Sequence, residues 1–249
     1  MRDGSPDRSP LCSARTLARI AGVLYVLVIV GAVIGPFGIA PSGLTVGANT
    51  VPSLEAILDS KVRYALGGGI LLAVYACDAA MALLFHRLLK PVGRFTSLLA
   101  AFFRLAFAAI ASANVVLNHF APLVLVSGWV DLSTLSGDQL KIIVHSFLLL
   151  RTIGFDFALV FFAIHILLLG YLVFESRFLP SILGVGLMIG AVGYLANIVV
   201  TVLPRDISVS LFPYVMLPAG VAEVAFALWL LTVGVNQQRW DDRTGISLA

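Results

Sequence analysis

Six long apolar stretches, each broken by only a few polar residues, dominate the hydrophobic pattern of this chain. They cover residues 19–40, 64–89, 95–117, 154–174, 179–203 and 212–235. A bilayer core about 30 Å thick needs about 20 apolar residues in a helix that rises about 1.5 Å per residue. Every stretch reaches that length. The sequence therefore predicts an all-α integral membrane bundle of six transmembrane helices.

The composition supports a membrane protein and argues against a nucleic-acid-binding one. Hydrophobic residues make up 60% of the chain and charged residues 12%, whereas a soluble domain carries about 25% charged residues. The net charge of +3 comes without a basic patch that alternates with exposed aromatic residues. We therefore expect membrane lipids as partners and no nucleic acid, and the pattern indicates no particular protein partner.

The polar segments at the two ends divide the chain into three parts. Residues 1–18 are rich in Arg, Asp, Ser and Pro, and we expect them to form a disordered cytoplasmic tail. Residues 19–236 form a single transmembrane helical domain, and residues 237–249 form a second cytoplasmic tail.

One segment outside the six stretches also has a helical pattern. Ser136 and Gln139 fit a capping box, and apolar residues then recur at helical spacing up to Leu150. This predicts a helix at about 138–152. The helix is either a seventh, interfacial element, an extension of the fourth span, or a mobile lid over an outward-facing cavity.

The distribution of Lys and Arg predicts the orientation. One side of the predicted topology holds ten of the sixteen: Arg2, Arg8, Arg15, Arg19, Arg87, Lys90, Arg94, Arg177, Arg239 and Arg243. The other side holds five, Lys61, Arg63, Lys141, Arg151 and Arg205, and Arg104 lies within a span. Because basic residues favour the cytoplasmic side, we expect both termini in the cytoplasm and the protein in the cell membrane.

Four ionisable residues from four spans form a predicted buried polar layer: Asp78, Arg104, His165 and Glu223. Asp78 and Arg104 are each thirteen residues from Pro91 in the turn between their spans, so they lie at equal depth and can pair. Counting along the helices places all four about 13–18 Å from one end. Glu223 is then either protonated or paired with His165. The layer is either a working site or a buried salt bridge that fixes helix register.

A second polar layer lies nearer the opposite end. Asp156 and Asn197 are equidistant from the turn at 176–177, and Asn114 and Asn118 share one face of their helix. Asp156 and His165 point in opposite directions around the same helix, so the two layers do not form one channel by this geometry.

Recognisable catalytic and cofactor motifs are missing from the sequence. It contains no HxxxH or HExxH metal motif, no CxxC, no GxSxG and no phosphate-binding loop. We therefore expect no metal and no other cofactor, and the sequence does not decide whether the protein is an enzyme.

Several segments resemble a bacterial multi-pass membrane family, the domain of unknown function number 4386. They are RIAGVLYVLVIVGAV from Arg19, LLKPVGRFTSLLAAFFRLAFAAI from Leu88, ALVFFAIHILLLGYLVFESRFLPSILGVGLMIGAVGYLAN from Ala158 and LPAGVAEVAFALWLL from Leu217. Arg104, His165 and Glu223 match recurring polar positions of that family. The resemblance implies a bacterial membrane protein with six to seven spans and supplies no activity.

Three functions remain open from the sequence. The buried polar layer binds or translocates a small molecule, an ion or a proton; or the protein is an intramembrane enzyme that acts on a lipid-like substrate. The third alternative is a non-catalytic structural or partner subunit.

Overall fold

A computed structural model describes residues 13–37, 54–201, 203 and 205–244 of the chain, and all regular structure in these residues is helical. The long helices are α1 (Ala14–Phe37), α3 (Lys61–Leu89), α4 (Arg94–Asn114), α6 (Gly137–Ser176), α7 (Ser181–Thr201) and α8 (Arg205–Thr232). A π-helical turn, Val115–His119, joins α4 to α5 (Phe120–Val126), so these three form one continuous rod. Two short helices complete the fold, α2 (Leu54–Asp59) and α9 (Gln237–Thr244).

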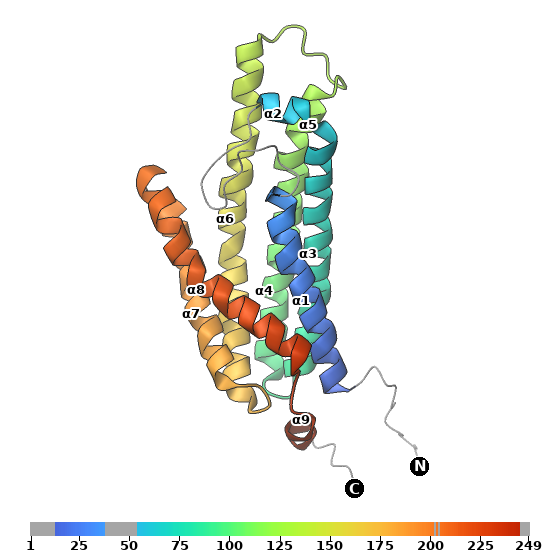
Figure 1. Cartoon of the computed structure of the whole chain (residues 1–249), viewed down its shortest axis with the longest axis vertical. Coiled ribbons are helices and arrows are strands. Elements are labelled where there is room, and N and C mark those ends of the chain that lie inside the picture. Colours follow the sequence, from blue (N-terminus) through green and yellow to red (C-terminus); the bar gives the residue numbers. More distant parts are fainter. Residues whose placement is uncertain (1–12, 38–53, 202, 204, 245–249) are drawn as a thin grey trace.

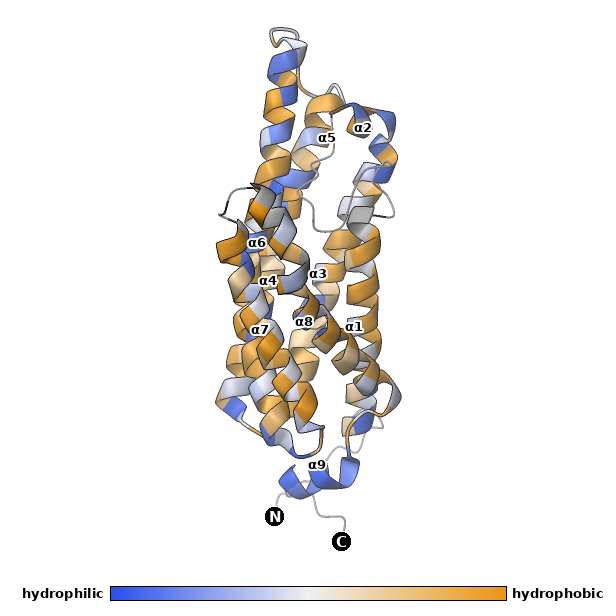
Figure 2. Ribbon diagram, turned by 60° about the vertical axis from the view of Figure 1, so that its left-hand side comes forward, coloured by the Kyte–Doolittle hydropathy of each residue, from blue (hydrophilic) through white to orange (hydrophobic). Residues whose placement is uncertain are grey.

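In the described residues, six helices are long and apolar enough to cross a bilayer. Figure 2 shows hydrophobic residues along the body of the bundle and hydrophilic residues gathered at its two ends. The predicted all-α bundle with six spans is confirmed, and the chain is a multi-pass membrane protein. Helix α1 begins at Ala14, and residues 1–12 of the predicted tail lie outside the described residues.

The six long helices form a closed ring. Each helix packs against its neighbour in the order α1, α3, α4, α6, α7 and α8, and α8 packs back against α1. Both ends of the described chain lie at the same end of the bundle (Figure 1). We call it the termini end.

The helix predicted near 138–152 is an extension of the fourth span. Helix α6 runs without interruption for 40 residues, which corresponds to about 60 Å and exceeds a bilayer core. Its start has the predicted capping box, in which Ser136 Oγ accepts from the backbone N–H of Gln139 at 3.2 Å and the Gln139 side chain accepts from the Ser136 N–H at 2.8 Å. The separate interfacial helix is not what the structure shows.

Close helix contacts in the ring depend on glycine. A Cβ on Gly184 of α7 would lie 2.6 Å from the carbonyl oxygen of Gly170 in α6, and a Cβ on Gly190 would lie 2.8 Å from Ala219 Cα in α8. Gly22 of α1 meets the Leu231 backbone of α8 in the same way, at 2.5 Å. Backbone contact at these points holds α7 between α6 and α8 and closes the ring between α8 and α1.

The ring is tight at the termini end and looser at the other. Every described side chain from Val26 to Ile34 of α1 and from Ile207 to Pro218 of α8 is exposed or partly exposed. In contrast, Tyr25, Phe226 and Leu230 of the same two helices are fully buried. Helices α1 and α8 therefore meet closely only in the half of the bundle near the termini.

Candidate functional site

The ion pair predicted between α3 and α4 is present in the structure. Arg104 Nη2 donates to Asp78 Oδ1, and both side chains are buried, with 0% and 2% of their residue surfaces exposed. Counting residues from the turn placed them at equal depth because a short turn fixes the register of two antiparallel helices. The pair is deep in the bundle, where an isolated charge would be costly.

Arg104 also binds His165 of α6, so three helices meet at one guanidinium. Arg104 Nη1 lies 2.9 Å from His165 Nε2, and His165 Nδ1 lies 2.8 Å from the carbonyl oxygen of Ala100. Because arginine can only donate and a carbonyl can only accept, Nε2 accepts and Nδ1 carries the proton. His165 is therefore a neutral imidazole in this arrangement.

Aromatic rings enclose the guanidinium on its remaining sides. The Cζ atom of Arg104 lies 5.2 Å from the ring centroid of Tyr25, 5.4 Å from Phe162 and 5.6 Å from Phe85. Such distances allow cation–π attraction, which is stronger when the cation is desolvated. Arg104 Nε is buried without a hydrogen-bond partner.

Glu223 completes this layer but does not pair with His165. Tyr25 of α1 donates to Glu223 Oε2 at 2.7 Å, and Tyr194 of α7 donates to Glu223 Oε1. Of the two alternatives expected for Glu223, the pair with His165 is not formed, because both nitrogens of His165 bind groups of α4. Glu223 instead faces the junction of α8 with α1 and α7.

The sequence analysis missed Tyr25 and Tyr194. A tyrosine in the middle of an apolar span carries a hydroxyl group that needs a partner, and this is the signal that could have identified both. With them, the layer draws one side chain from each of the six long helices. We call Tyr25, Asp78, Arg104, His165, Tyr194 and Glu223 the first layer.

The second predicted layer splits into two separate pairs. Asp156 of α6 accepts from Asn197 Nδ2 at 3.1 Å and from Thr201 Oγ1 at 2.9 Å, both of α7. On the other side, Asn118 donates to Asn114 at 2.7 Å, and Asn114 donates to the Arg151 carbonyl oxygen at 2.8 Å. These bonds agree with the equal depth expected for Asp156 and Asn197 and with the shared helix face expected for Asn114 and Asn118, and neither pair is bonded to the other.

A stacked pair beside Asn118 was also missed. His119 lies on the π-helical turn, and its ring stacks on Tyr64 of α3 with centroids 4.0 Å apart. His119 Nε2 donates to the Tyr64 carbonyl oxygen at 2.8 Å, while Nδ1 is buried without a partner. π-Helical turns occur often at functional sites. The turn at His119 is a feature of the backbone, and no motif in the sequence indicates it.

A family model described as Domain of unknown function (DUF4386) matches residues 20–234. The chain belongs to this family. The resemblance carried by the segments quoted above is thereby confirmed.

One relative of this DUF4386 chain is an archaeal protein. An uncharacterized protein of Archaeoglobus fulgidus (strain ATCC 49558 / DSM 4304 / JCM 9628 / NBRC 100126 / VC-16) is 28% identical over 171 residues, which cover 69% of this chain and 84% of that protein. The bacterial origin implied by the resemblance stays a prediction. No solved structure matches the chain. The comparisons assign a family and no activity.

Arg104, a permanent cation, occupies the centre of the first layer, where it binds both Asp78 and His165. In the described residues of the DUF4386 chain, no three His, Cys, Asp or Glu side chains gather closely enough to hold a metal ion.

Proposed function

We propose that this protein is a proton-linked membrane transporter of a small molecule or ion, in which Glu223 takes up and releases the proton. The charge balance of the first layer carries the proposal. Asp78 and Arg104 neutralise each other, and His165 is neutral by its hydrogen bonds. Glu223 is a further buried carboxyl group, 7% exposed, and its hydrogen-bond partners are the hydroxyl groups of Tyr25 and Tyr194. Its charge therefore depends on whether it holds a proton.

The partners of Glu223 suit a proton-exchange site. Tyrosine hydroxyls both donate and accept, so Tyr25 and Tyr194 can bind the ionised and the protonated carboxyl group alike. The guanidinium of Arg104, a permanent cation, lies over the ring of Tyr25, which donates to Glu223. Arg104 therefore favours the ionised form of Glu223, while burial favours the protonated form, and these opposed influences suit a group that exchanges protons.

The position of Glu223 would couple proton binding to a helix movement. Its bonds join α8 to α1 and α7 where the tight half of the ring ends. Beyond this point, every described side chain of α1 from Val26 to Ile34 and of α8 from Ile207 to Pro218 is exposed or partly exposed. A change in the Glu223 bonds would thus act at the base of a loosely packed stretch, and a transporter that opens alternately to the two sides needs such a hinge.

We also propose that both termini lie in the cytoplasm of a cell with this protein in its plasma membrane. The ten-to-five excess of Lys and Arg on the termini side supports this orientation. Reporter fusions after Arg94 and after Asp241 should both behave as cytoplasmic, and a fusion at Ser133 should behave as external. An external signal from the Arg94 fusion would reverse the orientation.

Proton exchange can be measured in liposomes that contain the purified protein and an internal pH-sensitive dye. With a potassium diffusion potential as the driving force, the wild-type protein should acidify the lumen faster than empty liposomes. Glu223→Gln should remove the increase, because Gln keeps the shape of the protonated acid and cannot release a proton. Tyr25→Phe should reduce the rate, since it removes one hydroxyl partner while keeping the ring that lies beside Arg104.

Asp156→Asn is the matched control for the loss of a carboxyl group within the bundle. Asp156 binds Asn197 and Thr201 in the second layer and has no bond to the first. This variant should keep the wild-type rate. Equal rates for Glu223→Gln and wild type would refute the assignment of the proton to Glu223.

A structural role is the second candidate, and the burial of the layer favours it. Asp78, Arg104, His165 and Tyr25 are all at most 2% exposed, and the layer joins all six long helices. Infrared difference spectra between acidic and alkaline pH separate the two functions. A carboxyl band that is lost in Glu223→Gln supports proton binding, and identical spectra of wild type and Glu223→Gln support the structural role.

A further inference from the structure

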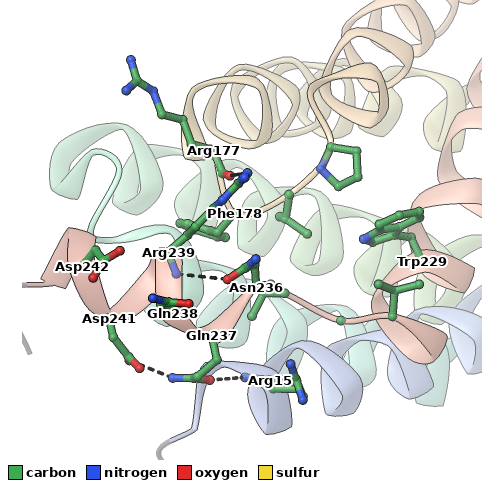
Figure 3. Close-up of a pocket in the computed structure, with 15 residues that line it drawn as sticks. Arg15, Arg177, Phe178, Trp229, Asn236, Gln237, Gln238, Arg239, Asp241 and Asp242 are labelled. Atoms are coloured by element: carbon green, nitrogen blue, oxygen red, sulfur yellow. Dashed lines mark hydrogen bonds between the residues drawn. The ribbon is translucent and has the colours of Figure 1, made fainter. Parts of the chain in front are cut away.

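A hollow at the termini end shares no lining residue with the first layer. Two adjoining cavities of about 950 and 800 Å³ surround the connection between α6 and α7. Both are lined by Arg177, Leu179, Pro180, Arg239 and Asp242. The larger one also reaches Arg15 at the start of α1 and Trp229 near the end of α8 (Figure 3).

Helix α9 forms one wall of this hollow, and hydrogen bonds between its side chains and backbone atoms of other segments fix it in place. Arg239 Nη1 donates to the Arg177 carbonyl oxygen at 3.0 Å, and Trp240 Nε1 donates to the Leu88 carbonyl oxygen at 3.0 Å. On the α1 side, the Gln237 side chain accepts from the Arg15 backbone N–H at 3.1 Å. The hollow is therefore built by the fold and does not depend on a single flexible side chain.

Positive charge predominates in the hollow. Its lining contains four arginines from three parts of the chain, Arg15, Arg177, Arg239 and Arg243, and two acidic residues, Asp241 and Asp242. Within the described residues, none of these arginines is within ion-pair distance of a carboxylate. Asp241 instead accepts from Gln237 at 2.8 Å. Arg239 and Arg243 each donate through Nη1 to a backbone carbonyl oxygen, those of Arg177 and Glu175, so the guanidinium groups of Arg15 and Arg177 are the ones available to an anion.

The start of α7 adds donors to the same place. Pro180 and Ser181 line the smaller cavity, and Ser181 is the first residue of a 21-residue helix. The first backbone N–H groups of a helix have no acceptor within it, and they favour phosphate groups together with the helix dipole. Guanidinium groups and a helix N-terminus are both typical partners of phosphate.

The surroundings of the hollow are apolar, as expected at a membrane surface. Phe178, Leu179 and Trp229 line it, and Trp is common at the membrane–water boundary. Beside it, Ile182 of α7 is 72% exposed and Val233, just past α8, is 52% exposed. A ligand with a charged head and apolar chains would match both parts.

We infer that this hollow binds the phosphate of an anionic phospholipid headgroup, whose acyl chains lie against the exposed apolar side chains of α7 and α8. Basic pockets between membrane helices bind such headgroups. Arg15 and Arg239 lie on different sides of the cavity, and the side chain of Arg177 extends outward from its rim (Figure 3). The lipid would thereby join α9 and the ends of α1, α6 and α8 into one unit.

The test is lipid binding by native mass spectrometry of the detergent-purified protein, with phosphatidylglycerol and phosphatidylcholine added at equal concentration. The wild-type protein should retain phosphatidylglycerol preferentially. Arg15→Gln combined with Arg177→Gly should bind it roughly 30-fold more weakly, because each arginine near an anionic lipid contributes about a fivefold factor.

These substitutions preserve the walls of the hollow. The contacts of α9 use the backbone atoms of Arg15 and Arg177, and both stay. Arg177 has a φ of 60°, a left-handed conformation that glycine adopts without strain, so Arg177→Gly should not impair folding. The matched control is Arg87→Gln with Arg94→Gln, which removes the same charge from exposed positions at this end of the bundle.

Three results would overturn the assignment to a lipid headgroup. One is equal retention of phosphatidylglycerol by wild type and the Arg15/Arg177 variant. Another is an equal loss in the Arg87/Arg94 control, which would indicate attraction by net charge alone. The third is displacement of the lipid by inorganic phosphate at the same concentration, which would assign the site to free phosphate.

Discussion

The two polar layers of the bundle are built from different chemistry. The first layer contains a buried ion pair, and its side chains bind across all six long helices. The second layer relies on amide and hydroxyl groups, with Asp156 as its one predicted ionisable member, and its pairs stay within neighbouring helices. Charge is concentrated where the ring is tight.

The two layers are alike in leaving one buried polar atom without a partner. In the described residues these atoms are Arg104 Nε in the first layer and Asn197 Oδ1 in the second. Unpaired buried polar groups are costly, and in the first layer the ion pair leaves neither of its two charges unpaired.

Removing a charge from the first layer should therefore have the largest effect. Arg104→Gln leaves Asp78 buried without its cation, and a broken buried pair typically costs about 3–5 kcal/mol of unfolding free energy. Asp78→Asn should have a similar effect. Thermal unfolding in detergent, followed by the fluorescence of a thiol-reactive dye or by circular dichroism, measures both.

The double variant tests whether the pair acts as a unit. Asp78→Asn with Arg104→Gln removes both charges, so its loss should be much smaller than the sum of the single losses. Additive losses would show that the two side chains stabilise the bundle independently, and the contrast between the layers would then not rest on the ion pair.

The fold followed from the sequence because helix length and apolar composition alone decide which segments can cross a bilayer. The ring closure did not follow, because α1 and α8 come from opposite ends of the chain and no turn fixes their register. The continuity of α6 was left open, since the pattern near Ser136 predicts a helix and does not say whether it joins the next span.

The site was predictable only where short turns connect the partners. Residue counting found Asp78 with Arg104 and Asp156 with Asn197, because each pair lies on helices joined by a tight turn. It failed for Glu223, whose helix is inclined across its neighbours (Figure 1). The inclination of α8 brings Glu223 to the tyrosine hydroxyls of α1 and α7, and no local sequence pattern indicates this inclination.

The smallest expected effect concerns the support of His119 beside the second layer. A Cβ on Gly68 would lie 2.6 Å from His119 Cδ2 and 2.7 Å from Phe120 Cζ, whereas a Cβ on Gly69 would meet nothing within 4 Å. Gly68→Ala should thus cost about 1–3 kcal/mol of unfolding free energy by displacing the stacked ring. Gly69→Ala, one position further along α3, should cause no loss and should gain about 0.5–1 kcal/mol from helix propensity. Thermal unfolding of the two variants side by side makes the comparison, and equal stabilities would show that His119 does not pack against Gly68.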